Sequence, residues 1–210
     1  MPFPRLTEQQ LDALREISNI GMGHAATALS QLTGKTIHVE VPRVLITDMA
    51  SMPELMGGTE RPVIGISLRM LGNAQGYILM VFPRENAIRI LQQLLPHKVA
   101  GGDTLSELEL SALTEVGNIL ASAYLNALGE MLRMTLIPSV PHLCIDNVGR
   151  LIDNALAEFG EVGGITLMLD TEFFSKDERV SGTFFLFPDT TSLDVILTAL
   201  GIETLPTSSI

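Results

Sequence analysis

The sequence predicts an α/β protein of the α+β type: a duplicated, pseudo-two-fold unit with two long amphipathic helices and a shared, mainly antiparallel sheet. Three observations lead to this prediction. A polar motif occurs twice, the apolar residues around it repeat with the same spacing, and the elements follow one another in the same order in both halves. The motif pairs, 99 positions apart, are Asp12/Ser111, Glu16/Glu115, Asn19/Asn118 and Pro42/Pro141. The apolar pairs with that spacing are Leu11/Leu110, Leu14/Leu113, Ile17/Val116, Ile20/Ile119 and Leu29/Leu128. We therefore expect one domain over residues 1–210, built from repeats of about 1–99 and 100–210.

Each repeat is predicted to begin with a long helix, at about 7–33 and 105–132. Both helices start with a capping-box pattern, Thr7-Glu8-Gln9-Gln10 and Thr104-Leu105-Ser106-Glu107. At 100° per residue, the polar positions of each helix fall on a strip about 60° wide, and the apolar positions fall on the opposite side. We call the strips the first ridge (Asp12, Glu16, Asn19 and Gly23) and the second ridge (Ser111, Glu115, Asn118 and Ser122). Both ridges are predicted to point outward.

The remaining elements also repeat. β-rich runs follow the helices at 36–41 with 43–46, and at 135–140 with 143–145. Pro42 and Pro141 interrupt these runs, which favours a bulge or an edge strand because proline cannot donate to a ladder. Hairpins follow around 65–79 and 164–185, the second one longer by seven residues near 175–179. Each half is predicted to end with a helix, at about 84–95 and 189–200. Short helices or loops are predicted at 49–58 and 150–161. A sheet shared by both halves is favoured because two separate small sheets would leave open edges.

Composition narrows the class of protein. The chain has 210 residues, 46% of them hydrophobic, with no tryptophan, which is enough to bury a core. No apolar run approaches the length of a membrane span, and the first residues lack the pattern of a signal peptide. A lone Cys144 cannot form an internal disulfide. We expect a cytoplasmic protein without membrane insertion.

The charge is negative and uneven. The net charge is −11, which argues against nucleic acid as a partner because phosphate contacts need clustered lysines and arginines. Residues 1–99 carry nine basic and eight acidic side chains, and residues 100–210 carry four and 16, so the halves have net charges of +1 and −12. Two explanations remain open: solubility, or a partner with exposed positive charge that faces the second half.

Several kinds of chemistry do not fit the residues. A metal site of the helical-bundle kind needs Glu-x-x-His, whereas both ridges have an asparagine in place of the histidine. Cys144 has no recognisable histidine partner in sequence, as a nucleophile would need, and the four histidines have no metal-ligand spacing. Gly21-x-Gly23 lies within a predicted helix and is not a phosphate-binding loop.

An asparagine amide can, however, orient a water molecule toward a phosphoryl group, as the glutamine of a GTPase does. A carboxylate one turn away could pair with a lysine and fix the register of a docked protein. Such a Glu–Asn pair is complete only when it meets another protein's phosphorylated site that already holds Mg²⁺ and a lysine. The alternative is two solvated helix faces that share these residues by chance.

At these residues the sequence resembles the CheC family of chemotaxis phosphatases. The resemblance lies in residues 14–28 and 115–120, and in the pattern Asp or Ser, three residues, Glu, two residues, Asn, 22 residues and Pro, which both halves satisfy. It covers nearly the whole chain. Two intact motifs favour CheC over the single-motif, dimeric CheX relatives, and the chain has no room for the switch domain of FliY-like proteins. Ser18 and His24 stand where many relatives carry Gly and Asn, but neither lies on a ridge.

The resemblance implies hydrolysis of the aspartyl phosphate of the response regulator CheY, with the deamidase CheD as a second partner. It implies that Glu16, Asn19, Glu115 and Asn118 are the catalytic residues. Asp12 and Ser111 would support docking, the two motif prolines would be structural, and the chain would be a monomer that needs no cofactor of its own, with Mg²⁺ bound by the regulator. A non-catalytic module that binds CheD or sequesters the phosphorylated regulator remains the alternative.

The resemblance also places the start of a CheD-facing surface after the second motif proline, at residues 143–147, with Asp146 as the candidate contact. The ordinary explanation of this stretch is a strand end with a turn-forming Asp-Asn pair. Both explanations remain open.

Overall fold

The two long helices have the same length and the same offset as the motif. In this computed structural model, which describes residues 7–95, 104–159, 166–175 and 178–199, α1 spans Glu8–Thr33 and α4 spans Glu107–Leu132, each with 26 residues. Both end at a residue with a left-handed backbone, Gly34 with φ 66° and Arg133 with φ 55°. The predicted bounds of both helices are confirmed to within two residues.

The start of α4 differs from the prediction. The capping box is formed by Ser106 and Glu109, two residues after the predicted Thr104–Glu107 pair. The Glu109 carboxylate accepts hydrogen bonds from the backbone N–H and the hydroxyl of Ser106, both at 2.7 Å. The sequence offers two overlapping capping patterns here. The folded chain uses the second pattern: Glu109 is buried, and Ser106 has the extended backbone of an N-cap.

The other elements keep the predicted order. In the first half they are β1 (His38–Thr47), the short helices η1 (Met49–Ser51) and α2 (Met52–Leu55), β2 (Pro62–Gly72), β3 (Gly76–Pro83) and α3 (Arg84–Leu94). In the second half they are β4 (Leu136–Pro138), β5 (His142–Asn147), α5 (Val148–Phe159), β6 (Thr166–Ser175), β7 (Glu178–Pro188) and α6 (Thr190–Ala199). The second β-rich run is thus split at Pro141 into two strands, whereas the first continues past Pro42 as one strand.

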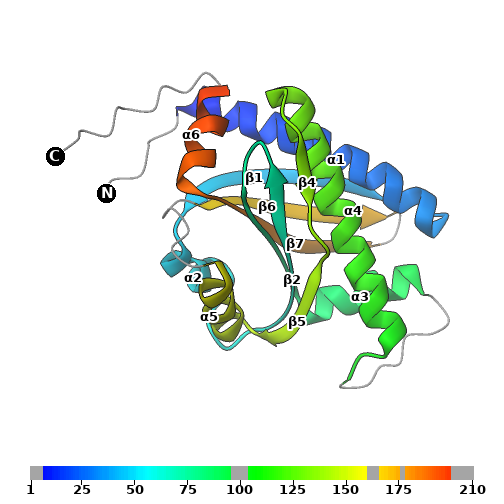
Figure 1. Cartoon of the computed structure of the whole chain (residues 1–210). Helices are drawn as coiled ribbons and strands as arrows, with labels where there is room; N and C mark the ends of the chain where they lie inside the picture. Colours follow the sequence, from blue (N-terminus) through cyan, green and yellow to red (C-terminus); the bar gives the residue numbers. More distant parts are fainter. Residues whose placement is uncertain (1–6, 96–103, 160–165, 176–177, 200–210) are drawn as a thin grey trace.

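The strands form one antiparallel sheet in which the two halves exchange their first strands. The order is β1-β6-β7-β3-β2-β4, and β5 also pairs with β2 (Figure 1). β1 of the first half pairs with the β6–β7 hairpin of the second, while β4 and β5 of the second half pair with β2 of the first. The shared antiparallel sheet is confirmed, and β1 is an edge strand, as its proline indicates.

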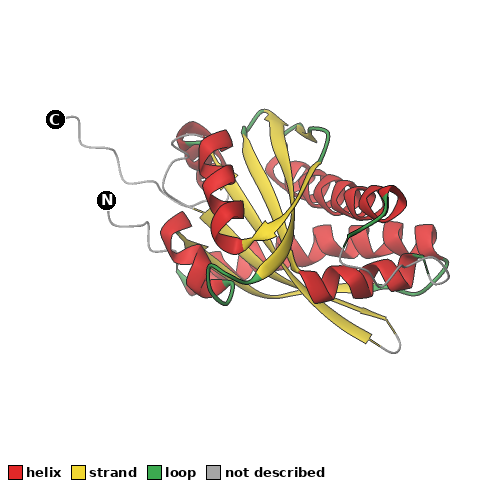
Figure 2. Ribbon diagram, turned by 90° about the horizontal axis from the view of Figure 1, so that it is seen from below, coloured by secondary structure: helices red, strands yellow, loops and turns green. Residues whose placement is uncertain are grey.

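Helices cover both faces of the curved sheet (Figure 2). Helices α1, α3, α4 and α6 contribute to one large apolar cluster, which includes Leu14, Leu91, Leu113 and Ile196. Helices α2 and α5 pack on the other face, where Met52, Leu151 and Phe185 belong to a second cluster. Helices α1 and α4 lie against each other at Gly21, where a Cβ atom would stand 3.1 Å from the Cα of Tyr124. The absent side chain at residue 21 therefore permits this close crossing.

Candidate functional site

The two ridges lie on the outer faces of α1 and α4. In the first ridge, Asn19 is half-buried and the other three positions are exposed. In the second ridge, Ser111 and Glu115 are exposed, whereas Asn118 and Ser122 are half-buried. The positions predicted to face the core are buried on both helices, among them Leu14 and Ile17 of α1 and Leu113 and Val116 of α4. On each helix the Glu and Asn are three residues apart, which is the spacing of side-chain neighbours on one face. The structure therefore confirms the outward direction of both ridges.

Asp12 has a local partner. Its carboxylate lies 3.2 Å from the Arg15 guanidinium, one turn further along the helix. Both side chains are largely exposed, so this ion pair contributes little to stability, about 0–1 kcal/mol. Ser111, the counterpart of Asp12, is uncharged and has no arginine nearby in sequence. The supporting positions of the two ridges therefore differ in charge.

The amide of Asn19 is held by a strand. The backbone N–H of Val41 donates to Asn19 Oδ1 at 2.8 Å. Val41 precedes Pro42 in the part of β1 where the pairing with β6 shifts register, between Glu40 and Arg43. Sequence reasoning missed this contact because the donor is a backbone group. The signal that could have revealed it is the fixed spacing of 22 residues from Asn19 to Val41.

The surroundings of Asn118 are different. Val140, the counterpart of Val41, lies outside the strands, between β4 and β5, and is 86% exposed. Among the residues that the structure describes, no hydrogen bond joins Val140 to Asn118. The two ridges therefore match in sequence but differ in how the asparagine is supported.

A buried hydroxyl pair lies beneath the first ridge. Ser18, fully buried, donates to the carbonyl oxygen of Leu14 at 2.7 Å and is hydrogen-bonded to the Tyr124 hydroxyl of α4. Burial raises the pKa of Tyr124 from 10.0 to about 12. Ser18 thus joins the two long helices and is not on the ridge, as predicted; His24 is exposed and also off the ridge.

Asp146 is the penultimate residue of β5, at the corner before α5. Its Oδ1 accepts from the backbone N–H of Asn147 at 2.9 Å, and its Oδ2 lies 3.9 Å from the Arg150 guanidinium. Asn147 in turn accepts from the Arg150 backbone N–H, so the pair forms the turn that starts α5. The side chain of Asp146 is 26% exposed. Nearby, burial and the Asp146 carboxylate raise the pKa of the Cys144 thiol, which disfavours the thiolate that a nucleophile would need.

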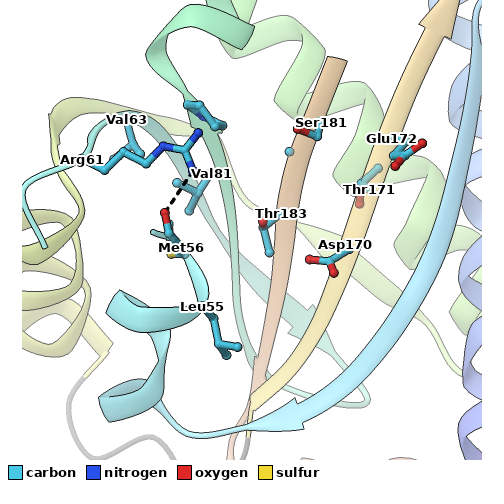
Figure 3. Close-up of a pocket in the computed structure, with 12 residues that line it drawn as sticks. Leu55, Met56, Arg61, Val63, Val81, Asp170, Thr171, Glu172, Ser181 and Thr183 are labelled. Carbon is cyan, nitrogen blue, oxygen red and sulfur yellow. Dashed lines mark hydrogen bonds between the residues drawn. The ribbon is translucent and has the colours of Figure 1, made fainter. Parts of the chain in front are cut away.

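A hollow that is remote in sequence from both ridges is shown in Figure 3. A cavity of about 260 Å³ is lined by parts of α2, β2, β3, β6 and β7, including Met56, Arg61, Asp170, Ser181 and Thr183. Arg61 donates to the Met56 carbonyl oxygen at 3.2 Å (Figure 3) and pairs with Glu85 at 3.0 Å. None of the residues that line this cavity belongs to either ridge. The candidate residues therefore form helix surfaces that suit a macromolecular partner, and they do not line a small-molecule cleft.

Two further findings concern the described part of the chain. No group of three His, Cys, Asp or Glu side chains there is arranged to hold a metal ion. No described helix is both long enough and apolar enough to cross a membrane.

Comparison with known proteins gives consistent matches. The model of the CheC-like family matches residues 10–46 and 108–145, and each matched segment contains one ridge and its proline. CheY-P phosphatase CheC of Bacillus subtilis is 35% identical over 203 residues, which cover 95% of this chain and 97% of that protein.

Two solved structures share the fold. The crystal structure of Thermotoga maritima FliY has a TM-score of 0.76 and 21% identity, and the match covers 93% of this chain and 98% of that one. The FliM middle domain from H. pylori has a TM-score of 0.66 and 14% identity, with coverage of 92% and 99%. The fold, the duplicated family match and the extended identity agree with one another. The chain belongs to the CheC-like family.

Proposed function

We propose that this protein is a chemotaxis phosphatase that hydrolyses the aspartyl phosphate of the response regulator CheY. The observation that carries the proposal is the 35% identity over 95% of the chain to a relative named CheY-P phosphatase CheC. Both Glu-x-x-Asn motifs are intact in this sequence and lie at the molecular surface. Each is accessible to a second protein.

The proposed reaction is attack of water on phosphorus, in line with the bond to the aspartate oxygen. That P–O bond breaks, the electron pair returns to the aspartate carboxylate, and inorganic phosphate leaves. Asn19 and Asn118 orient the attacking water, which is a contribution of position and not of acid–base chemistry. Glu16 and Glu115 pair with a lysine of the regulator and fix its register on the helix. Mg²⁺ arrives with the regulator as part of the substrate.

The shape of the protein supports a substrate that supplies most of its own site. The Glu and Asn of each ridge lie on one face of a helix, and the cavity of Figure 3 contains neither. An exposed helix can insert an amide into another protein's phosphorylated site, whereas a free phosphorylated metabolite would need a cleft with several anion-binding groups. The ridges therefore favour a phosphoprotein.

The proposal includes CheD as a second partner, at a surface that starts near Asp146. The remaining alternative is a non-catalytic module that sequesters the phosphorylated regulator or binds CheD. Binding and hydrolysis use the same ridges, so only turnover separates them.

A turnover assay tests the proposal. Phosphorylated CheY is mixed with one-twentieth of its concentration of this protein, and loss of the acyl phosphate is followed. We expect many turnovers per molecule, and a rate at least about 100-fold lower for Asn19→Ala/Asn118→Ala, with the fold retained because both sites are at the surface. No acceleration over the spontaneous loss of the acyl phosphate would favour sequestration. An unchanged rate in the double variant would exclude the asparagines.

A further inference from the structure

The bulge in β1 has a simple geometry. Glu40 pairs with Glu172 and Arg43 pairs with Asp170, so Val41 and Pro42 together stand opposite the single residue Thr171. This two-against-one arrangement defines a β-bulge. Pro42 has no N–H to give to the ladder, and the N–H of Val41 goes to Asn19 on α1. The bulge therefore releases one backbone donor from the sheet and directs it at the first ridge.

That donor fixes which end of the Asn19 amide faces the strand. An asparagine has an acceptor oxygen and a donor NH₂ group, and the two can exchange places by rotation of the amide. With Oδ1 bound to the Val41 N–H, the NH₂ group faces away from β1. Its two hydrogens remain for a water molecule or a phosphoryl oxygen.

The second ridge lacks this arrangement. β4 has only three residues, Val140 is 86% exposed, and Pro141 lies between two strands that both pair with β2. Within the described ranges, no hydrogen bond reaches Asn118 from residues 138–142. In the described part of the chain, Asn118 thus has no backbone donor from this region to fix the orientation of its amide.

We propose that the Val41–Pro42 bulge is a positioning device for Asn19: the Val41 N–H holds Oδ1 so that the NH₂ group is oriented before a partner docks. The inference rests on the proposed function, because orientation of water is the role given there to Asn19. It extends that function by making the two sites unequal in geometry. The first site begins with its amide oriented, and the second orients its amide only on docking.

Deletion of Pro42 tests the bulge in a protein in which only the first site works. In the Glu115→Ala/Asn118→Ala background, this deletion changes the pairing from two-against-one to one-against-one and keeps the register on both sides. We expect kcat for phosphorylated CheY to fall by about 10- to 100-fold with little change in KM, because a misoriented amide affects the reaction more than docking. The matched control is deletion of Pro141 in the Glu16→Ala/Asn19→Ala background, where we expect a change below about twofold. Equal losses in both proteins, or no loss in either, would overturn the inference.

A second measurement does not depend on catalysis. Hydrogen exchange of the Val41 amide, followed by NMR, should be slow in the wild-type protein and faster in Asn19→Ala. Asn19→Asp keeps an acceptor for Val41 and loses the NH₂ donors, so it should preserve slow exchange while first-site hydrolysis is lost. Exchange that is equally fast in the wild type and in Asn19→Ala would overturn the inference even if Pro42 deletion unfolds the protein. Absence of turnover in the parent background, with Val41 protected, would instead contradict the proposed function.

Discussion

Ser18 and Tyr124 show how a single polar contact is accommodated between two apolar helix faces. The hydroxyl of Ser18 bonds to the carbonyl oxygen of Leu14, and the Tyr124 hydroxyl bonds to Ser18, so neither buried group lacks a partner. The Tyr124 ring also contacts Phe184 of β7, with ring centroids 4.8 Å apart. Helix α1, helix α4 and the sheet therefore meet at this tyrosine, directly beneath the first ridge.

Tyr124 should make the protein less stable at high pH. Its pKa is about 12 in the folded protein against 10.0 for the unfolded chain. The folded state favours the neutral phenol, so this contribution is complete below pH 10 and is lost as the pH rises from 10 to 12. Between pH 9 and 11 it amounts to about 1 kcal/mol. Urea unfolding at both pH values should show this loss in the wild type and not in Tyr124→Phe.

Ser18→Ala is the matched control for that measurement. It keeps the buried phenol, so its stability should fall between pH 9 and 11 as much as that of the wild type. At neutral pH it should be less stable by about 1–3 kcal/mol, because the Tyr124 hydroxyl loses its partner. A pH dependence in Tyr124→Phe as large as in the wild type would show that another group is responsible.

At the residue scale, the sequence predicts which side chains are exposed but not what holds them. The period of the helix is enough to place Glu16 and Glu115 outward, because their opposite faces are apolar. The support of Asn19 could not be predicted in the same way. Its partner is a backbone N–H that is available because β1 is bulged where it pairs with β6. Strand β6 lies about 130 positions further along the chain, so no local pattern reveals this pairing.

At the scale of elements, the exchange of strands between halves explains what repetition alone could not predict. An offset of 99 residues shows that two units are alike. It does not decide whether β1 pairs with the hairpin of its own half or with the hairpin of the other half. In the structure it pairs with β6, and Arg43 of β1 contacts Asp170 of β6 at 2.8 Å. Each half therefore completes the sheet of the other, which is a property of tertiary packing.

The two motif prolines show how similar sequences give different elements. Pro42 lies within a ten-residue strand that continues through a bulge, whereas Pro141 separates β4 from β5. The strands also contact different helices: β1 packs along α1, and Ser30 of α1 accepts from the backbone N–H of Ile37 at 2.9 Å. Residue 129, the counterpart of Ser30, is a glycine and has no side chain to do this. In the first half, Asn19 and Ser30 of the helix thus hydrogen-bond to the backbone of Val41 in β1 and of Ile37 just before it.

The corner between β5 and α5 is the element to test for CheD binding. Asp146→Lys reverses a partly exposed charge and should weaken CheD binding in a titration by about tenfold or more, if CheD offers a basic group there. Glu130→Lys, the same charge change at an exposed position of α4, is the control and should bind CheD as the wild type does. Unchanged affinity in Asp146→Lys would remove Asp146 from the CheD surface and leave it with its turn-forming role.

In the whole molecule, the charges of the two halves of the sequence are not kept apart. The net charges of +1 and −12 belong to stretches of sequence, but the halves share a sheet, and Arg43 of the first lies against Asp170 of the second. The difference at the ridges is smaller. Helix α1 has three acidic residues and Arg15, whereas α4 has four acidic residues and no basic one. One of those four, Glu109, is buried in the first turn, where it bonds to the N-cap residue Ser106.

The surface of α4 is still the more acidic of the two, and this leads to a prediction about rates. A regulator that offers a lysine should associate faster with the second ridge, because electrostatic attraction acts chiefly on association. Below KM and at low salt, Glu115→Ala/Asn118→Ala should therefore lose more activity than Glu16→Ala/Asn19→Ala.

Salt and saturation separate this electrostatic effect from the geometric one. Exposed charges are screened over roughly 8–10 Å at physiological ionic strength, so the gap in kcat/KM between the two double variants should narrow as salt is added. The oriented amide of Asn19 is expected to raise kcat, and this effect does not depend on salt. At saturating regulator, Glu115→Ala/Asn118→Ala, which keeps only the first site, should therefore have the higher kcat at low and at high salt. Steady-state rates of both variants over a range of regulator concentrations, at low and at high salt, give both quantities. A gap in kcat/KM that does not change with salt would mean that the acidic surface of α4 has no part in choosing the site.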